Sequence, residues 1–157
     1  MRNWMFTGVL AALACEPRAI DPQQMAGLPT SELMDDPEVA KRVDALAAEG
    51  RVESSHIGAA GSPSTVWAKA VELGKAASVD QRIRLLDHQS PAVRVYMAGS
   101  LCDEPTAQAA LSRLATDAST VPVTDGCDAS PSTVAAEVSS RRWCTDALAG
   151  KEPQIVK

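Results

Sequence analysis

A Ser-Pro helix-start signal that occurs three times constrains this chain more than any other feature of its sequence. The signal stands at Ser62-Pro63, Ser90-Pro91 and Ser130-Pro131, and in each copy a valine follows within three residues of the proline. A serine side chain can cap a helix, and proline at the first helical position loses no hydrogen bond because that N–H has no partner in a helix. The three copies therefore predict three helices that begin at these prolines.

Each of these helices follows a segment that is itself predicted to be helical. In the first such segment, Val39, Val43 and Leu46 recur at helical spacing before Gly50, which is a natural C-terminal cap. Apolar residues follow the same period in two later segments, residues 79–88 and 105–115.

Pairing each segment with the helix after it produces three helical hairpins, at about residues 37–75, 79–102 and 105–148. The chain has 157 residues, of which 45% are hydrophobic and only 3% aromatic. Such a core suits close-packed helices, because alanine and leucine are the residues that helices accommodate best. We therefore predict one all-α domain of stacked hairpins, with an irregular helical bundle as the alternative.

The middle hairpin carries a resemblance to a known family. Leu85-Leu86-Asp87 precedes Ser90-Pro91-Ala92-Val93-Arg94, and Ala98-Gly99-Ser100-Leu101 closes the helix. This pattern over residues 80–101 resembles a HEAT repeat of the PBS-lyase-like type, in which helical hairpins stack into an α-α superhelix and bury their apolar stripes against one another. The resemblance also implies that Arg94 braces the neighbouring turn through Asp87. The first and third hairpins depart from the pattern, because each has a long insertion between its helices.

The N-terminus has the layout of a secretory signal. One arginine precedes the apolar run of residues 4–14, which is too short to cross a membrane as a helix. Ala12-Leu13-Ala14-Cys15 resembles the lipobox of bacterial lipoproteins, which implies that Cys15 is lipidated and anchors the protein to a membrane surface. A plain secretory signal and a buried N-terminal helix are the alternatives.

These patterns divide the chain and predict its location. We assign residues 1–14 to a signal peptide, 15–30 to a tether that contains proline and glutamine, 31–150 to the helical domain and 151–157 to a tail. The predicted location is a bacterial cell envelope, as a periplasmic or outer-membrane-associated lipoprotein.

Two long loops, residues 51–61 and 119–129, connect the helices of the first and third hairpins. In a stacked array they emerge on one edge, with the turn at residues 87–89 between them, and a notch between long loops is a plausible contact site. The candidate binding residues on this edge are Arg51, His56, His88 and Asp125. The alternative is that the loops only cover the ends of a short stack.

The second loop also contains a strand-like pattern. Residues 120–124 alternate like an extended strand, and Asp125-Gly126 is a turn signal. We expect Val121 and Val123 to cover the end of the core.

Three cysteines remain besides Cys15. An exported protein is expected to oxidise one pair. If the second and third Ser-Pro helices lie parallel and adjacent, Cys102 and Cys144 sit at similar heights, which favours a Cys102–Cys144 disulfide. Pairing of Cys127 with Cys144 or with Cys102 stays open.

Charge and motifs narrow the function. The net charge of −5 argues against a nucleic-acid partner, which needs a basic surface. We find no zinc-type cysteine spacing, repeated His-Glu pair or phosphate-binding loop, and we assign no metal, cofactor or catalytic residue. We therefore expect a non-enzymatic module that binds an unidentified partner protein. The alternatives are a secreted hydrolase or thiol enzyme that uses Cys127 and His56, and a structural envelope spacer without a specific ligand.

Overall fold

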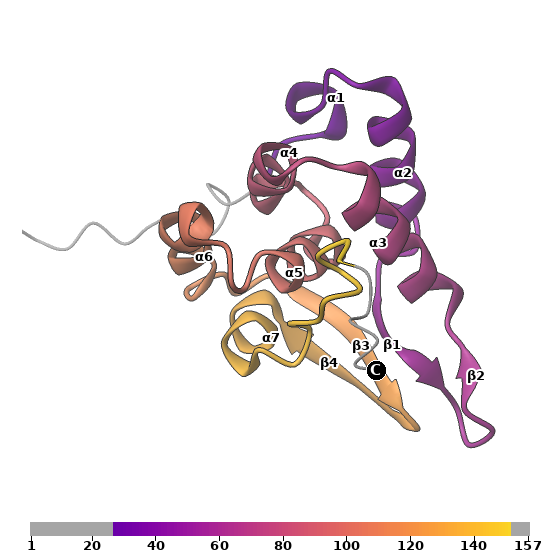
Figure 1. Ribbon diagram of the computed structural model, residues 1–157. Helices are drawn as coiled ribbons and strands as arrows, with labels where there is room; N and C mark the ends of the chain where they lie inside the picture. Colours follow the sequence, from indigo (N-terminus) through magenta and orange to yellow (C-terminus); the bar gives the residue numbers. More distant parts are fainter. Residues whose placement is uncertain (1–26, 152–157) are drawn as a thin grey trace, which may run out of the picture.

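The computed structural model describes residues 27–151, and these form seven α-helices, two short 3₁₀ helices and one four-stranded sheet (Figure 1). The elements in chain order are α1 (Thr30–Leu33), α2 (Pro37–Ala47), β1 (Val52–Ile57), β2 (Ser62–Pro63), α3 (Thr65–Ala76), α4 (Val79–Arg84), η2 (Leu85–Asp87), α5 (Pro91–Ser100), η3 (Pro105–Ala107), α6 (Gln108–Leu114), β3 (Thr120–Gly126), β4 (Asp128–Thr133) and α7 (Val134–Ser140). The prediction of an all-α stack of HEAT-like hairpins is therefore wrong, since the fold is mixed α/β.

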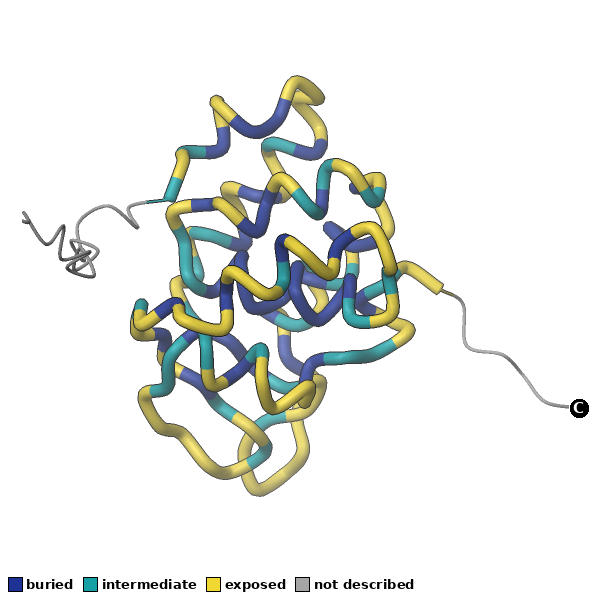
Figure 2. Tube along the Cα trace, turned by 90° about the vertical axis from the view of Figure 1, so that its left-hand side faces the viewer, coloured by how far each residue is buried: buried dark blue, intermediate teal, exposed yellow. Residues whose placement is uncertain are grey.

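Helix α5 lies in the middle of this fold. Every residue from Ala92 to Ser100 is buried, and α2, α3, α4, α7, β1 and β3 all contact the helix. Pro91 occupies its first turn, as the second Ser-Pro signal predicts. Figure 2 shows the result along the trace, with buried segments through the middle of the body and exposed segments at its ends.

Two of the three Ser-Pro signals do not start helices. Pro63 belongs to β2, and α3 begins only after Ser64, whose side chain accepts a hydrogen bond from the Trp67 N–H. Pro131 lies within β4, and the cap of α7 is Thr133, whose hydroxyl accepts from the Ala136 N–H. In both copies a serine or threonine further along supplies the cap, which frees the Ser-Pro pair to join a strand.

The helices outside these two copies follow the sequence pattern. Asp36 caps α2 by accepting from the Glu38 and Val39 N–H groups, and Gly50 beyond the helix has a φ of +64°. Ser78 and Gln81 form a reciprocal capping box at the start of α4. Helix α6 and η3 fill the predicted segment 105–115. The prediction of helices in these three regions is confirmed.

The two segments predicted as long loops form the sheet instead. Its strand order is β2-β1-β3-β4, with β1 and β3 parallel and the two outer pairs antiparallel. The extended pattern of residues 120–124 is confirmed, and Val121 and Val123 are buried as expected. Strands form here because Val52 and Val123 pair across the parallel junction, where their side chains cover the end of the helical core.

A tight turn explains how two prolines fit this sheet. Asp125 pairs with Asp128, so Gly126, the last residue of β3 with a φ of +59°, and Cys127 form a two-residue turn. In an antiparallel hairpin closed by two residues, hydrogen-bonded and non-hydrogen-bonded pairs alternate from the turn outwards. Pro122 lies opposite Pro131 at a non-hydrogen-bonded pair, so the missing N–H groups remove no hydrogen bond between β3 and β4.

The chain after α7 is not the continuous helix that the third signal predicts. Arg141 ends α7 in a left-handed conformation (φ 53°), and residues 141–151 then cross α5 and α3 as an irregular strap. Two glycines permit this close approach. A Cβ on Gly99 would lie 2.5 Å from the Trp143 carbonyl oxygen, and one on Gly74 would lie 2.0 Å from that of Leu148.

Two further interactions hold the strap. A disulfide joins Cys102, just after α5, to Cys144, with a Cα–Cα distance of 5.7 Å, and this is the pair that the spacing favours. The rings of Trp67, Tyr96 and Trp143 form a cluster with centroids 6.0–6.4 Å apart. Cys144 reaches Cys102 from the strap and not from a parallel helix, so the predicted geometry behind the pairing is wrong.

The packed body begins earlier than residue 31. Leu28 donates its N–H to the Asp87 carbonyl and accepts from the Gln89 N–H, and Gly27 lies so close that a Cβ would meet the His88 carbonyl at 2.5 Å. Residues 27–30 therefore belong to the fold and not to the predicted tether. The signal segment 1–14, Cys15 and most of the predicted tail lie outside the described residues.

Loss of the disulfide should destabilise the protein in oxidising buffer only. The bond closes a loop with a sequence separation of 42, for which chain entropy predicts a contribution of about 4 kcal/mol. We expect Cys102→Ser to lower the midpoint of thermal unfolding in oxidising buffer and to match the wild type in reducing buffer. Cys127→Ser is the control and should leave the midpoint unchanged in both. An equal midpoint for Cys102→Ser and the wild type without reductant would contradict this prediction.

Candidate functional site

The two segments predicted as contact loops meet, as the hairpins β1–β2 and β3–β4. The Gly58 N–H donates to the Gly126 carbonyl at 2.9 Å, and the Gly126 N–H donates to Ser54 Oγ at 3.0 Å. These bonds tie the ends of the two hairpins together, and both hairpins project from the helices in the same direction (Figure 1). The tertiary structure thus brings residues 51–61 and 119–129 side by side, but as strands of one sheet.

The four predicted binding residues do not share one environment. His56 is exposed on β1, and its Nδ1 lies 3.1 Å from Ser55 Oγ. Asp125 is half exposed and pairs with Arg142 at 3.3 Å. Arg51 lies at the start of β1, near the helices, and His88 is buried. Only His56 and Asp125 therefore lie toward the projecting end of the sheet. The prediction that His88 binds a partner is wrong, because no part of this residue reaches the surface.

His88 is instead part of a buried chain of hydrogen bonds. The Ser90 N–H lies 2.9 Å from Nδ1, which must therefore accept, so the proton of the neutral ring is on Nε2. Nε2 lies 3.0 Å from Thr30 Oγ1, and the Thr30 hydroxyl donates to Asp44 at 2.6 Å. Burial and the nearby Arg94 hold the pKa of His88 below its usual value. The chain of bonds fastens residues 27–30 to the turn before α5.

Acid should destabilise the protein through His88. Because its pKa is lower in the folded state, the unfolded chain binds the proton first, and the free energy of unfolding falls as the pH drops below about 6.5. One proton contributes at most about 1.4 kcal/mol per pH unit. Urea unfolding between pH 7 and pH 5 should show a shallower pH dependence for His88→Gln than for the wild type, and His56→Gln is the control. Identical pH slopes for His88→Gln and the wild type would contradict the assignment.

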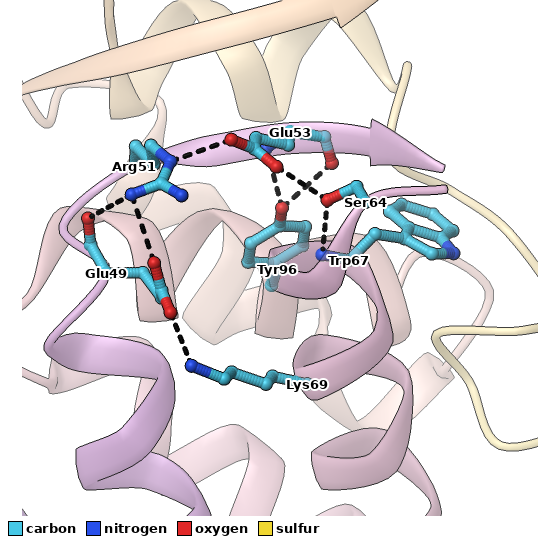
Figure 3. Close-up of polar contacts among 7 residues, drawn as sticks. All are labelled: Glu49, Arg51, Glu53, Ser64, Trp67, Lys69 and Tyr96. Carbon is cyan, nitrogen blue, oxygen red and sulfur yellow. Dashed lines mark hydrogen bonds and ion pairs between the residues drawn. The ribbon is translucent and has the colours of Figure 1, made fainter. Parts of the chain in front are cut away.

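A second buried polar cluster lies where β1 leaves the helices (Figure 3). The Tyr96 hydroxyl accepts from the Glu53 N–H at 2.7 Å and donates to the Glu53 carbonyl at 2.8 Å. The Glu53 carboxylate accepts from Arg51 Nε at 2.7 Å and from Ser64 Oγ at 2.6 Å. Burial raises the pKa of Tyr96. Each polar group here has a partner, so the cluster clamps β1 to α3 and α5.

This cluster continues into a chain of ion pairs that involves the predicted binding residue Arg51. Arg51 also pairs with Glu49 at 3.0 Å, and Glu49 in turn contacts Lys69 of α3. The hydrogen bond from Lys69 lowers the pKa of Glu49, and the hydrogen bond to Glu53 raises the pKa of Arg51. Arg51 is therefore engaged by carboxylates on both sides and acts in the structure as a positioning residue for β1.

Removal of the Tyr96 hydroxyl should destabilise the fold. Tyr96→Phe leaves the backbone N–H and carbonyl of Glu53 facing a buried ring without a partner, which costs about 1–3 kcal/mol. Chemical denaturation should detect this loss. The exposed Ser55→Ala on the same strand is the control and should change stability by less than about 0.5 kcal/mol. Equal stability of Tyr96→Phe and the wild type would show that the clamp does not hold β1.

Arg94 braces the turn before α5, but not through the carboxylate that the HEAT resemblance implies. Its Nε donates to Asp117 at 2.8 Å, and its Nη1 donates to the carbonyls of His88 and Gln89. Asp87 pairs with Arg113 at 3.1 Å instead. The expected contact with Asp87 is therefore wrong, whereas the bracing of the turn is present.

The thiol-enzyme alternative needs Cys127 and His56 in contact. Cys127 is a free, exposed cysteine in the turn between β3 and β4, next to Gly126, which pairs with Ile57. The hairpins thus bring the two residues to the same end of the sheet. Within residues 27–151, however, no hydrogen bond joins the thiol to the imidazole, and the ring contacts Ser55. This is not the nucleophile–base pair that such chemistry requires.

The sheet presents an exposed surface that the sequence did not predict. We call it the outer sheet face, and its residues are Thr120, Pro122, Thr124, Ala129, Pro131 and Thr133. All six are small or medium-sized and uncharged, and each is exposed or only partly covered. Alternation along a strand places them on the side opposite the buried Val121 and Val123. Threonine and proline alternate with other residues in segments 120–124 and 129–133, and this alternation could have predicted a strand pair with an exposed face. We instead assign the first segment to a loop and a helix start to the second from the sequence.

Other contributions had no usable signal in the sequence. Thr30 binds His88 across 58 positions, and Tyr96 binds Glu53 across 43. Within the described residues no group of three His, Cys, Asp or Glu side chains is placed to hold a metal ion. Over the same residues no helix is long and apolar enough to cross a bilayer.

Comparisons of this chain with protein-family models, with curated proteins and with solved structures find no match. The resemblance to a HEAT repeat therefore depends on residues 80–101 alone and stays a prediction. Its helical pair is present as α4 and α5, but neighbouring hairpins do not continue it as a stack.

Proposed function

We propose that this chain is an exported, lipid-anchored protein of a bacterial cell envelope that binds a partner protein through the outer sheet face. The observation that carries the proposal is the meeting of the two hairpins. The register of β3 and β4 places six uncharged residues on one face of the sheet, and the contact between the hairpins holds this part of the sheet where it projects from the helical body.

The chemistry of this face favours docking onto it and not strand addition at its edge. β4 is one of the two edge strands, the other being the two-residue β2, and alternation from the turn directs the backbone of Pro131 away from β3. Proline has no N–H there to donate to an added strand, which protects sheet edges. The partner would therefore contact the threonine and proline side chains of the outer sheet face.

Three features support the proposed location. The segment before Cys15 has the apolar run and small residues of an export signal, and Ala12-Leu13-Ala14-Cys15 resembles a lipobox. The disulfide between Cys102 and Cys144 is of the kind that persists in oxidising compartments. Residues 16–26 separate the proposed anchor, Cys15, from the folded body, and this length of chain leaves room for the sheet to reach a partner.

The anchor is tested by metabolic labelling. Cells that express the protein with radioactive palmitate should label the wild type and not Cys15→Ser, because Cys15 carries the proposed lipid. Cys127→Ser is the matched control and should retain the label. Absence of label from the wild type would refute the lipid anchor.

The contact surface is tested in the same strain by photocrosslinking. A photoreactive maleimide on Cys127 of the Cys15→Ser protein should capture a discrete envelope protein, and Pro131→Glu should abolish that adduct because it puts a charge on the outer sheet face. The control carries the label at Ser31→Cys on α1, with Cys127→Ser, and should give no such adduct. An adduct that survives Pro131→Glu, or no adduct from Cys127, would contradict the proposed surface and favour the spacer alternative.

A further inference from the structure

Two cavities flank the disulfide at the end of α5, away from the outer sheet face. The larger, about 280 Å³, is apolar and lies between α6 and α7. The smaller, about 180 Å³, is polar and is lined by Arg82, Glu104, Asp146, Lys151 and the two disulfide cysteines, among others. The smaller cavity contains the one buried charge that the described residues leave without an opposite charge.

That charge is Arg82 of α4. Only 8% of the residue is exposed, and Nη1 donates to the carbonyls of Ser100 at 3.2 Å and Ala149 at 3.3 Å. Nε is buried and has no hydrogen-bond partner among the described residues, and no carboxylate in that part of the chain lies within ion-pair distance of the guanidinium. A buried arginine is rarely left this way, because desolvation of the charge is costly unless a partner compensates it.

Asp146 supplies an opposite charge on the same cavity wall without touching Arg82. Asp103, also on the wall, pairs with Arg141 at 3.2 Å, and Glu104 accepts from both the backbone N–H and the hydroxyl of Thr106. Asp146 has no ion pair within residues 27–151. Lys151 on the same wall also has no ion pair among the described residues, and neither has Glu104, so the cavity wall carries unpaired charges of both signs, of which only Arg82 is buried.

We propose that this cavity binds a small α-amino acid, whose carboxylate contacts Arg82 and whose ammonium group contacts Asp146. The guanidinium matches a carboxylate in shape and charge. A simple anion would meet the acidic wall, and a simple cation would meet Arg82, whereas a zwitterion satisfies both. The volume of about 180 Å³ is below the range of drug-sized ligand sites, as a ligand of a few heavy atoms requires.

Burial lowers the pKa of Arg82, the charge of Glu104 on the cavity wall opposes this shift in part, and a bound carboxylate would oppose it further. The site does not depend on the proposed partner surface, since no residue of the outer sheet face lines it.

The test follows the side-chain Nε–H signals of ¹⁵N-arginine in the full chain carrying Cys15→Ser while glycine is added. We expect the Arg82 signal to move saturably, with binding at least about tenfold weaker for acetate, which lacks the ammonium group, and for methylammonium, which lacks the carboxylate. Arg84, two residues further on and exposed, is an internal control whose signal should not move.

Variants separate ligand binding from folding. Titration calorimetry should detect no glycine binding to Arg82→Lys. Asp146→Asn should bind glycine only as weakly as the wild type binds acetate, and Arg84→Lys should bind glycine like the wild type. Because Asp146 is exposed, its variant tests the site even if Arg82→Lys fails to fold. Equal shifts of the Arg82 and Arg84 signals, or no shift with glycine, would overturn the proposal. Binding of glycine only after Glu152→Gln would also overturn it, since Arg82 would then serve a carboxylate of the chain itself.

Discussion

Complete burial of α5 is the constraint on which the rest of this structure depends. A helix with no face toward water must be covered on every side, and here α2, α3, α4 and α7 cover it together with β1 and β3. Gly99 near its C-terminal end allows the strap of residues 141–151 to pack closely, because a side chain at this position would clash with the backbone of Trp143. The disulfide then holds this strap at the point of closest approach. A change in any covering element therefore exposes apolar surface of α5.

The buried polar groups follow one rule, with one exception. His88, Glu53 and Arg94 are each surrounded by partners, and they fasten the N-terminal residues, β1 and the turn before α5 to the core. Burial of such groups is tolerated because their hydrogen bonds replace those that water would make. Among the described residues Arg82 lacks this compensation, and it also borders a polar cavity. An uncompensated charge at a cavity wall distinguishes a ligand site from a structural clamp.

The fold keeps its two proposed binding regions apart. The sheet projects from one side of the helical body, and its ends are joined by bonds between Gly58 and Gly126 and between Gly126 and Ser54. The Arg82 cavity lies at the end of α5 beside the strap. Binding in the cavity would stabilise the strap, whereas contact at the outer sheet face would leave it unchanged, so the two proposals are physically independent.

The sequence by itself determined the helices at 37–47, 79–84 and 91–100 and the buried strand pattern of 120–124, whereas it favoured the correct cysteine pair for a geometry that the fold does not have. Capping, proline placement and apolar period act over a few residues, so they can be recognised without knowledge of the rest of the chain. Only the tertiary structure decided that Pro63 and Pro131 lie in strands. A strand needs a partner distant in sequence, and a Ser-Pro-Ser-Thr segment satisfies both a helix start and the edge of a sheet until that partner is present. The same long range separates Thr30 from His88 and leaves Arg82 without an ion pair among residues 27–151, so these sites became visible only when distant elements packed around α5.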